Sequence, residues 1–280
     1  MFWVRNWLRN VKRRRRISSA VREIDDRVSH GIEGRPHHAL SKPLIITLTS
    51  YPARFGTLSH TLKSILFQDV RPDATILWIA SDDYDRLPRD VLALKTYGLE
   101  IAKCSDIRSY KKIIPAVKEH PGSYILTVDD DVWYPENCIG QFVASCSPTE
   151  PTVLARRAHV VALGANGLPL PYPQWEQTVR HEEKGPLVFP TGVGGVIYPP
   201  DAFHEDVARE DVFSSICSDA DDIWLYWMWR MKGLNGHKLP GKMRLLEWEG
   251  SQASSLRANN LSGGNDRCVQ AMIKRYGFPS

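Results

Sequence analysis

A chain of 280 residues with 42% hydrophobic and 24% charged side chains has the composition of an ordinary soluble globular protein, long enough for one large domain or two small ones. Its five cysteines are odd in number and show no Cys-x-x-Cys spacing, which argues against a disulfide framework and a structural zinc site and fits a reducing cytosol. No apolar stretch is long enough for a signal peptide or a transmembrane helix.

The net charge of +4 originates in an N-terminal arm, residues 1–22. This arm holds eight Arg or Lys and no acid, which leaves 28 basic and 32 acidic residues for the remaining body. Trp3 and Trp7 precede the basic run Lys12–Arg16. We expect the arm to attach to an anionic membrane surface, with both tryptophans at the level of the headgroups. A nucleic-acid-binding arm and a solvated, disordered start are the alternatives.

Strand and helix patterns alternate after the arm. Residues from about 17 to 42 are polar and include Gly and Pro, which predicts a linker that follows a short helix. The expected strands are 44–48, 74–80, 99–103, 123–128 and 153–157, and helices are expected from about 58, 89 and 111 onward. Strands separated by helices indicate βαβ units, so we expect an arm and linker over 1–42 and a single α/β domain with a mainly parallel sheet over 43–280.

Three consecutive aspartates, Asp129, Asp130 and Asp131, end the strand-like run 123–128. Like charges this close repel, so a fold keeps them together when a cation neutralises them. Carboxylate oxygens suit Mg²⁺ or Mn²⁺, which usually share their coordination with substrate phosphates. The strand places the carboxylates at the C-terminal edge of a sheet, where open α/β folds bind ligands. We therefore favour a metal and phosphate site over a solvated acidic turn.

Several segments together carry a resemblance that is more specific than the aspartate triplet alone. They are 49–55, 109–115, 192–200, 204–206, 220–225 and 263–266. With the triplet, they resemble the GT-A glycosyltransferases, in particular family 2-like bacterial enzymes that build capsule or lipopolysaccharide and hold the metal of a nucleotide-sugar with an Asp-x-Asp motif. The likeness covers roughly residues 43–276. It implies a single GT-A (Rossmann-like) domain, with a nucleotide-binding half over about 43–131 and an acceptor-binding half over about 132–280.

The resemblance implies a metal-dependent transfer of a sugar from a nucleotide diphosphate, with a UDP-sugar as the favoured donor, to a saccharide acceptor. Asp131 is then a direct ligand of Mn²⁺ or Mg²⁺, and Asp129 contacts the ribose or the metal. Asp130 can exchange roles with either, because a triple aspartate leaves the register open. Residues that follow the first two strands are implied to contact the base and the ribose. These are Tyr51, Arg54 and Asp82 or Asp83.

Asp221 and Asp222 open an apolar helical stretch, 223–230. By resemblance they are the acidic pair of inverting GT-A enzymes, in which the second acid is the general base for the acceptor hydroxyl, so Asp222 is the expected base. Arg230 stands further from the pair than the corresponding arginine of the family pattern, which leaves its role open. Both aspartates are equally suited to cap the helix and complement its dipole.

Other residues are candidates for contacts with phosphate and sugar. Lys111 and Lys112 lie just before an expected helix, where a lysine offers a point charge to phosphate, although an exposed helix start is the alternative. Gly194 and Gly195 permit close backbone approach, and by resemblance their N–H groups face the donor sugar. Trp175, in an irregular loop, is a candidate for stacking on an acceptor sugar.

Two rival functions stay open. A nucleotidyltransferase on a related fold needs a Gly-rich phosphate loop after its first strand, where this chain has Tyr51–Arg54. A non-catalytic protein whose basic arm grips nucleic acid would bind independently of Asp131. We favour a cytoplasmic transferase, peripheral on the inner face of the cell membrane, whose acceptor is a lipid-linked glycan or a lipopolysaccharide core.

Overall fold

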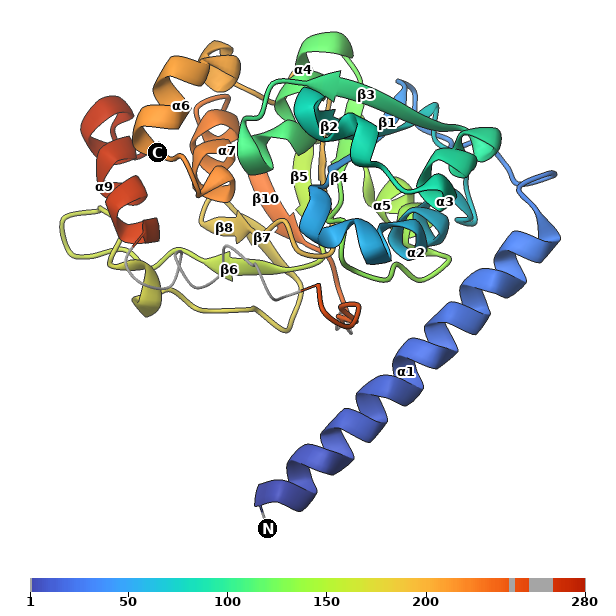
Figure 1. Ribbon diagram of the computed structural model, residues 1–280. Coiled ribbons are helices and arrows are strands. Elements are labelled where there is room, and N and C mark those ends of the chain that lie inside the picture. The colour runs from blue at the N-terminus through green and yellow to red at the C-terminus, as the bar shows by residue number, and fades with distance from the viewer. Residues whose placement is uncertain (1, 242–244, 252–263, 280) are drawn as a thin grey trace.

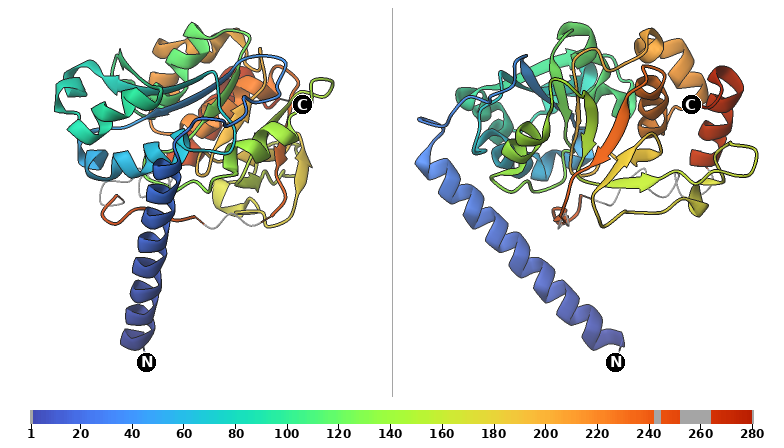
Figure 2. Two further views of the ribbon diagram at one scale, coloured as in Figure 1. Left: turned by 90° about the vertical axis from the view of Figure 1, so that its right-hand side faces the viewer. Right: turned by 180° about the vertical axis from the view of Figure 1, so that it is seen from behind.

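An eight-stranded sheet forms the centre of the body, and helices cover both of its faces (Figures 1 and 2). The computed structural model describes residues 2–241, 245–251 and 264–279. The strands of the sheet are β1 (Leu44–Thr49), β2 (Ala74–Ala80), β3 (Leu99–Cys104), β4 (Tyr124–Thr127), β5 (Thr152–Ala155), β7 (Glu183–Gly185), β9 (Val196–Tyr198) and β10 (Asn235–Lys238). The helices are α1 (Phe2–His30), α2 (Phe55–Leu66), α3 (Arg89–Leu92), α4 (Ile114–Glu119), α5 (Cys138–Ser145), α6 (Glu210–Ile216), α7 (Asp221–Arg230) and α9 (Asn265–Tyr276). A separate two-stranded sheet pairs β6 (Ala158–Val160) with β8 (Val188–Pro190).

The strand order β3-β2-β1-β4-β9-β5-β10-β7 makes the sheet mainly parallel. β1 pairs in parallel with β2 and β4, β2 with β3, and β5 with β10. Two strands run the other way: β9 lies antiparallel between β4 and β5, and β7 lies antiparallel beside β10. The predicted α/β class and the mainly parallel sheet are confirmed. The strands were recognisable because a strand buried on both faces needs a nearly continuous apolar run.

Successive side chains of β1 point to opposite faces of the sheet, and the core accordingly forms two large clusters, one on each face. Ile45 faces the cluster that contains residues of α4, α6, α7 and α9, whereas Leu44 and Ile46 face the cluster with α2, α3 and α5. Trp224 and Trp227 of α7 are fully buried in the first cluster. The aromatic stripe of α7 is therefore core, as helical spacing of apolar residues indicates.

The carboxyl ends of β1, β2 and β4 meet at one edge of the sheet, where most of the predicted site residues begin. Because β9 is antiparallel to β4, with Val196 opposite Thr127, the glycine-bearing segment 191–195 reaches this same edge. The hydroxyl of Thr47 donates a hydrogen bond to the carbonyl of Lys112 at 2.7 Å, which fixes the 3-10 turn after β3 beside β1. Segments far apart in the sequence thus converge on one edge.

α1 is one continuous helix of 29 residues that ends at His30, so the expected linker does not begin at residue 17. Ala20 and Ile24 are buried and pack with Leu246 and Trp248 in a third, small apolar cluster. Arg27 is buried as well. The segment is polar on average, but its apolar residues recur at three- and four-residue spacing, and this stripe packs on the body as a helix.

The N-terminal half of α1 projects beyond the body (Figures 1 and 2). Trp7, in this projecting part, is 64% exposed. In the described ranges, no helix combines the length and the apolar character that crossing a membrane requires.

We expect the substitution Ile24→Ala to lower the free energy of unfolding by about 2–5 kcal/mol, because it removes a buried aliphatic side chain and leaves a cavity between α1 and the body. Urea unfolding monitored by tryptophan fluorescence measures this cost. Leu92→Ala is the control, since Leu92 is 37% exposed, and its cost should stay below about 1 kcal/mol. An Ile24→Ala cost as small as that of the control would mean that α1 does not pack on the body in solution.

Candidate active site

Arg54 and Ser50, which follow β1, hold one side of the aspartate triplet. Asp130 accepts a hydrogen bond from the hydroxyl of Ser50 at 2.5 Å and another from the guanidinium of Arg54 at 2.5 Å. The same guanidinium lies 3.3 Å from a carboxylate oxygen of Asp131 and 5.4 Å from the ring centroid of Tyr51. Arg54 thus ties two of the three aspartates to the first strand.

Lys112 stands between the triplet and the N-terminus of α7. Its Nζ lies 2.9 Å from Asp221 and 3.8 Å from Asp129. Asp222, the next residue of α7, accepts the backbone N–H of Gly192 through both carboxylate oxygens, at 3.1 and 3.2 Å. A Cβ on residue 192 would lie only 2.9 Å from Lys112 Nζ, and 3.3 and 3.8 Å from the nearest oxygens of Asp222 and Asp129. A side chain at position 192 would therefore displace the end of the Lys112 side chain from the place where the two acidic groups approach each other.

Negative charge is in excess at this edge of the sheet. Burial, reinforced by repulsion from Asp129, raises the pKa of Asp131 to about 7. Burial would lower the pKa of Lys112, but the attraction of Asp221, Asp129 and Asp222 raises it well above its ordinary value. Five carboxylates face two cationic side chains, so the site favours binding of a further cation.

The donor set fits a hard divalent cation. Carboxylate oxygens are the ligands that Mg²⁺ and Mn²⁺ prefer. Asp130 already accepts hydrogen bonds from Ser50 and Arg54 and is the least suited of the three to bind a metal. This arrangement favours the predicted assignment of Asp129 and Asp131 as metal ligands and gives Asp130 a role in anchoring the loop.

Two residues that the sequence did not point to fix the backbone of the triplet. The N–H of Asp129 donates to the hydroxyl of Tyr134 at 2.9 Å, and the N–H of Trp248 donates to the carbonyl of Asp131 at 3.1 Å. The indole Nε1 of Trp248 in turn donates to the hydroxyl of Thr61 at 2.7 Å. Tyr134 lies close to the triplet in sequence, and this closeness is the signal that could have found it. Trp248 comes from a distant segment and had no local signal.

The remaining predicted residues are only partly brought together. Lys111 is buried but forms an ion pair with Asp106, so the two adjacent lysines point to different partners. Asp82 is exposed at the start of the turn that follows β2, and among the described residues no hydrogen bond or ion pair joins it to the triplet. Their predicted contacts with nucleotide stay predictions.

Gly194 and Gly195 form the turn that leads into β9. Both have positive φ, 91° and 100°, a backbone conformation that favours glycine. A Cβ on Gly195 would lie 3.2 Å from the ring of Phe142. The turn thus needs glycine for conformation and for space, and the predicted contact of its N–H groups with a donor sugar stays a prediction.

Trp175 does not present its ring to solvent. It is 3% exposed, and its Nε1 donates to the carbonyl of Leu170 at 2.8 Å. Its ring contacts those of Tyr172 and Phe189. The prediction that Trp175 stacks on an acceptor sugar is wrong, because the irregular loop folds its aromatic residues inward.

A second group of metal-ligating residue types lies near the start of β1. His37, His38 and Asp73 place three ligand atoms within 4.8 Å of one another, the one such group of three among the described residues. Nδ1 of His38 accepts the N–H of Leu40, so its Nε2 carries the proton and donates to Asp73 at 2.6 Å. A protonated Nε2 does not bind a metal. The group ties the segment before β1 to the sheet.

Comparisons with known proteins give only distant similarities. No protein-family model matches the chain, and none of the curated proteins matches it. Among solved structures, Staphylococcus aureus TarS 1–349 is similar at 13% identity over 84% of this chain and 72% of that chain, with a TM-score of 0.46. The mannosyltransferase PcManGT from Pyrobaculum calidifontis in complex with GDP-Man and Mn²⁺ is similar at 12% identity over 91% and 76%, also with a TM-score of 0.46. The inositol-1-phosphate CTP transferase from T. maritima is similar at 8% identity over 85% and 98%, with a TM-score of 0.39. At these values the similarities do not decide the function, which has to be argued from the site.

Asp222 should contribute a decrease in the stability of the free protein as pH rises from about 4 to about 7. Burial, with repulsion from Asp221, raises the pKa of Asp222 from 3.8 to about 7. The folded state then holds a proton that the unfolded chain has already released, so rising pH favours unfolding across this window. Each tenfold change in proton affinity corresponds to about 1.4 kcal/mol.

Urea unfolding at both ends of this window measures the effect, and Asp222→Asn should remove at least about 1 kcal/mol of the decrease, because Asn does not titrate. Asp219→Asn is the control, since Asp219 lies near the same helix start but is paired with the exposed Arg108. Equal pH dependence in wild type and Asp222→Asn would contradict the raised pKa.

Proposed function

We propose that this protein is a metal-dependent glycosyltransferase that moves a sugar from a nucleotide diphosphate, with a UDP-sugar favoured, to a saccharide acceptor with inversion of configuration. The observation that carries the proposal is the convergence of Asp129, Asp222 and Lys112 around Gly192. Asp222, the candidate base, and Asp129, in the candidate metal site, are 93 residues apart in sequence and lie on either side of one largely buried lysine, Lys112.

Asp222 is the proposed general base. Its carboxylate is aimed by the N–H of Gly192, and its raised pKa gives it a proton affinity suited to accepting a proton near neutral pH. As the acceptor hydroxyl gives its proton to Asp222, its oxygen forms a bond to the anomeric carbon. The bond from that carbon to the diphosphate oxygen breaks on the opposite face, and the electron pair leaves with the nucleotide.

Asp129 and Asp131 would hold a divalent cation, which would supply charge neutralisation for the departing diphosphate. Lys112 offers a second positive charge beside Asp129, and its pair with Asp221 fixes the direction of its ammonium group. Arg54 and Tyr51 stand at the end of β1, where the base and ribose of the donor are proposed to bind. In this proposal Asp129, Asp131 and Lys112 hold the diphosphate of the donor, and Asp221 holds Lys112 in place.

The acceptor is proposed to be a saccharide of a surface polysaccharide or of lipopolysaccharide, and the site of action the cytoplasmic face of the membrane. The motif resemblance and the basic N-terminal arm support this assignment. A nucleotidyltransferase is less well supported, because the turn after β1 carries Arg54 bound to Asp130 in place of a Gly-rich phosphate loop.

A panel of nucleotide-sugars tests the proposal directly. With Mn²⁺ or Mg²⁺, one of them should release free nucleotide in the presence of saccharide acceptors, and EDTA should abolish the release because the diphosphate would depart without neutralisation. Asp131→Asn should weaken donor binding, measured by calorimetry in the presence of metal, at least about tenfold. Mutation of a residue that supports a metal site typically lowers the metal affinity about 10- to 100-fold. Donor uptake that is unaffected by EDTA would refute metal dependence, and release of diphosphate from nucleoside triphosphates would indicate nucleotidyl transfer.

Asp222→Asn should lower kcat by about 10²- to 10⁴-fold while the Kd of the donor changes by less than about threefold, because Asn keeps an acceptor for Gly192 N–H but does not take up a proton. Steady-state kinetics and calorimetry on the same preparation measure the two quantities. Asp219→Asn, a nearby carboxylate outside the convergence, is the matched control and should leave both within about threefold. If donor binding is lost in Asp222→Asn, the assignment of Asp222 as base fails.

A further inference from the structure

The positive charge of α1 is placed where it destabilises a helix. Residues 1–22 contain eight basic side chains and no acid, and the acidic residues of α1 begin at Glu23. The helix dipole favours anions near the N-terminus and cations near the C-terminus, the reverse of this distribution. In the run Lys12–Arg16, like charges also stand four residues apart, which is unfavourable in an isolated helix. An external anion would relieve both costs.

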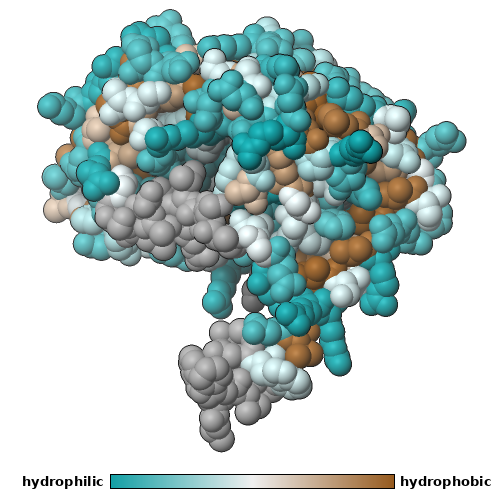
Figure 3. Space-filling model, viewed as in Figure 1, coloured by the Kyte–Doolittle hydropathy of each residue, from teal (hydrophilic) through white to brown (hydrophobic). Residues whose placement is uncertain are grey.

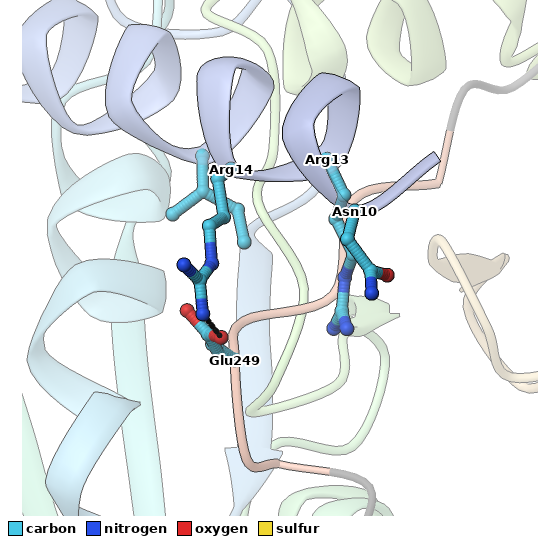
Figure 4. A pocket seen from close by; sticks show the side chains of 5 residues that line it. Asn10, Arg13, Arg14 and Glu249 are labelled. Atoms are coloured by element: carbon cyan, nitrogen blue, oxygen red, sulfur yellow. Dashed lines mark ion pairs between the residues drawn. The ribbon is translucent and has the colours of Figure 1, made fainter. Parts of the chain in front are cut away.

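The body uses only some of these basic side chains. Arg13 and Arg16 donate to backbone carbonyls of the segment 245–248 at 3.3–3.4 Å. Arg14 lies 3.5 Å from Glu249, and both side chains are largely exposed (Figure 4). These contacts lie on the side of α1 that faces the body.

The opposite side of α1 carries cations that the described part of the chain does not neutralise. Lys12, Arg15 and Arg22 are exposed and form no hydrogen bond or ion pair with another described residue. A shallow hollow on this side is lined by Val11, Arg15, Ser18, Ser19 and Arg22, with Arg14 at its border toward the body. Figure 3 shows hydrophilic side chains standing out from α1 below the body. We call this surface, together with Lys12, the outward face of α1.

We propose that the outward face of α1 is a docking surface for a lipid bilayer that contains anionic lipids. Lys12, Arg15 and Arg22 meet the phosphate groups, and Trp7, which is 64% exposed, enters the headgroup region. α1 then lies in the plane of the interface as an amphipathic helix, while its C-terminal half remains packed on the body through Ile24.

The composition of the projecting half favours a bilayer over a nucleic acid. Trp3, Val4, Trp7, Leu8 and Val11 accompany the basic residues, at the three- and four-residue spacing of a helix. An interfacial helix needs such apolar residues because buried apolar area supplies much of its binding energy, whereas contacts to a phosphate backbone are electrostatic. The body carries 28 basic and 32 acidic residues, which does not extend a track for a long polyanion beyond the arm.

Vesicle sedimentation with the full-length protein tests this surface. Wild type should bind vesicles of phosphatidylcholine with about one-third phosphatidylglycerol at ~0.1 M salt, should not bind pure phosphatidylcholine, and should release at ~0.5 M salt. Replacing Lys12, Arg15 and Arg22 together by Ser should weaken binding about 100-fold, or about fivefold for each basic side chain removed near an anionic surface. Trp7→Ser should weaken it severalfold at unchanged charge.

The matched control replaces Lys42, Lys118 and Arg180 by Ser, which removes the same charge from exposed positions of the body, and its binding should equal that of wild type within about threefold. Far-ultraviolet circular dichroism checks that each variant keeps its helices. Wild-type affinity of the outward-face variant, or no binding of wild type to anionic vesicles, overturns the proposal. So does tighter binding of an RNA or DNA oligonucleotide that Trp7→Ser leaves unchanged, since this assigns the arm to nucleic acid. Vesicle binding is read without sugar transfer, so this proposal and the proposed function can fail separately.

Discussion

The crowding of carboxylates at one edge of the sheet is the constraint on which the rest of the site depends. Asp129 to Asp131 follow β4, and Asp221 and Asp222 begin α7. Because these carboxylates are close together and largely buried, their mutual repulsion must be offset. The fold offsets part of this repulsion with two cations held next to β1: Arg54 in the turn that follows it, and Lys112, whose carbonyl accepts a hydrogen bond from Thr47. Two cations do not balance five carboxylates. The remaining negative charge is the physical reason why this edge suits a cation and, through it, a diphosphate.

The antiparallel direction of β9 brings Gly192, and through it Asp222, to the aspartate triplet. A parallel strand in this position would begin at the opposite edge of the sheet, but antiparallel β9 begins beside the end of β4. Gly192, just before β9, therefore meets both the triplet and the start of α7, and its N–H orients Asp222. Helix capping and general-base chemistry were alternatives for Asp222 from the sequence. In the structure this carboxylate accepts from Gly192, outside its own helix, which favours a positioned base over a simple cap.

The sequence predicted the features that depend on neighbouring residues or on a regular spacing of apolar residues. Continuous apolar runs predict the buried parallel strands, and the position of the triplet directly after one such run predicts an acidic edge of the sheet. The length of α1 was not predicted. Its buried residues Ala20 and Ile24 are few, and their burial depends on contacts with Leu246 and Trp248, which are distant in sequence. Trp175 was misjudged because an irregular loop gives no period from which burial can be deduced. Partners distant in sequence, such as Trp248 for Asp131, are set by tertiary packing alone.

α1 and the acidic loop share a support, which joins the arm to the chemistry. The segment 245–248 receives Arg13 and Arg16 from α1, and the N–H of its Trp248 donates to the carbonyl of Asp131. Arg27 of α1 donates to the carbonyl of Tyr134, whose hydroxyl accepts the N–H of Asp129. The triplet is thus held from both sides by contacts that lead back to one helix. A helix built into the support of the site in this way cannot act as a freely tethered anchor, because whatever surface its outward face binds is held at a fixed distance and orientation from the acidic edge. Under the proposed function, with an acceptor carried by a membrane, this rigid relation would give the site a defined position and orientation above the surface.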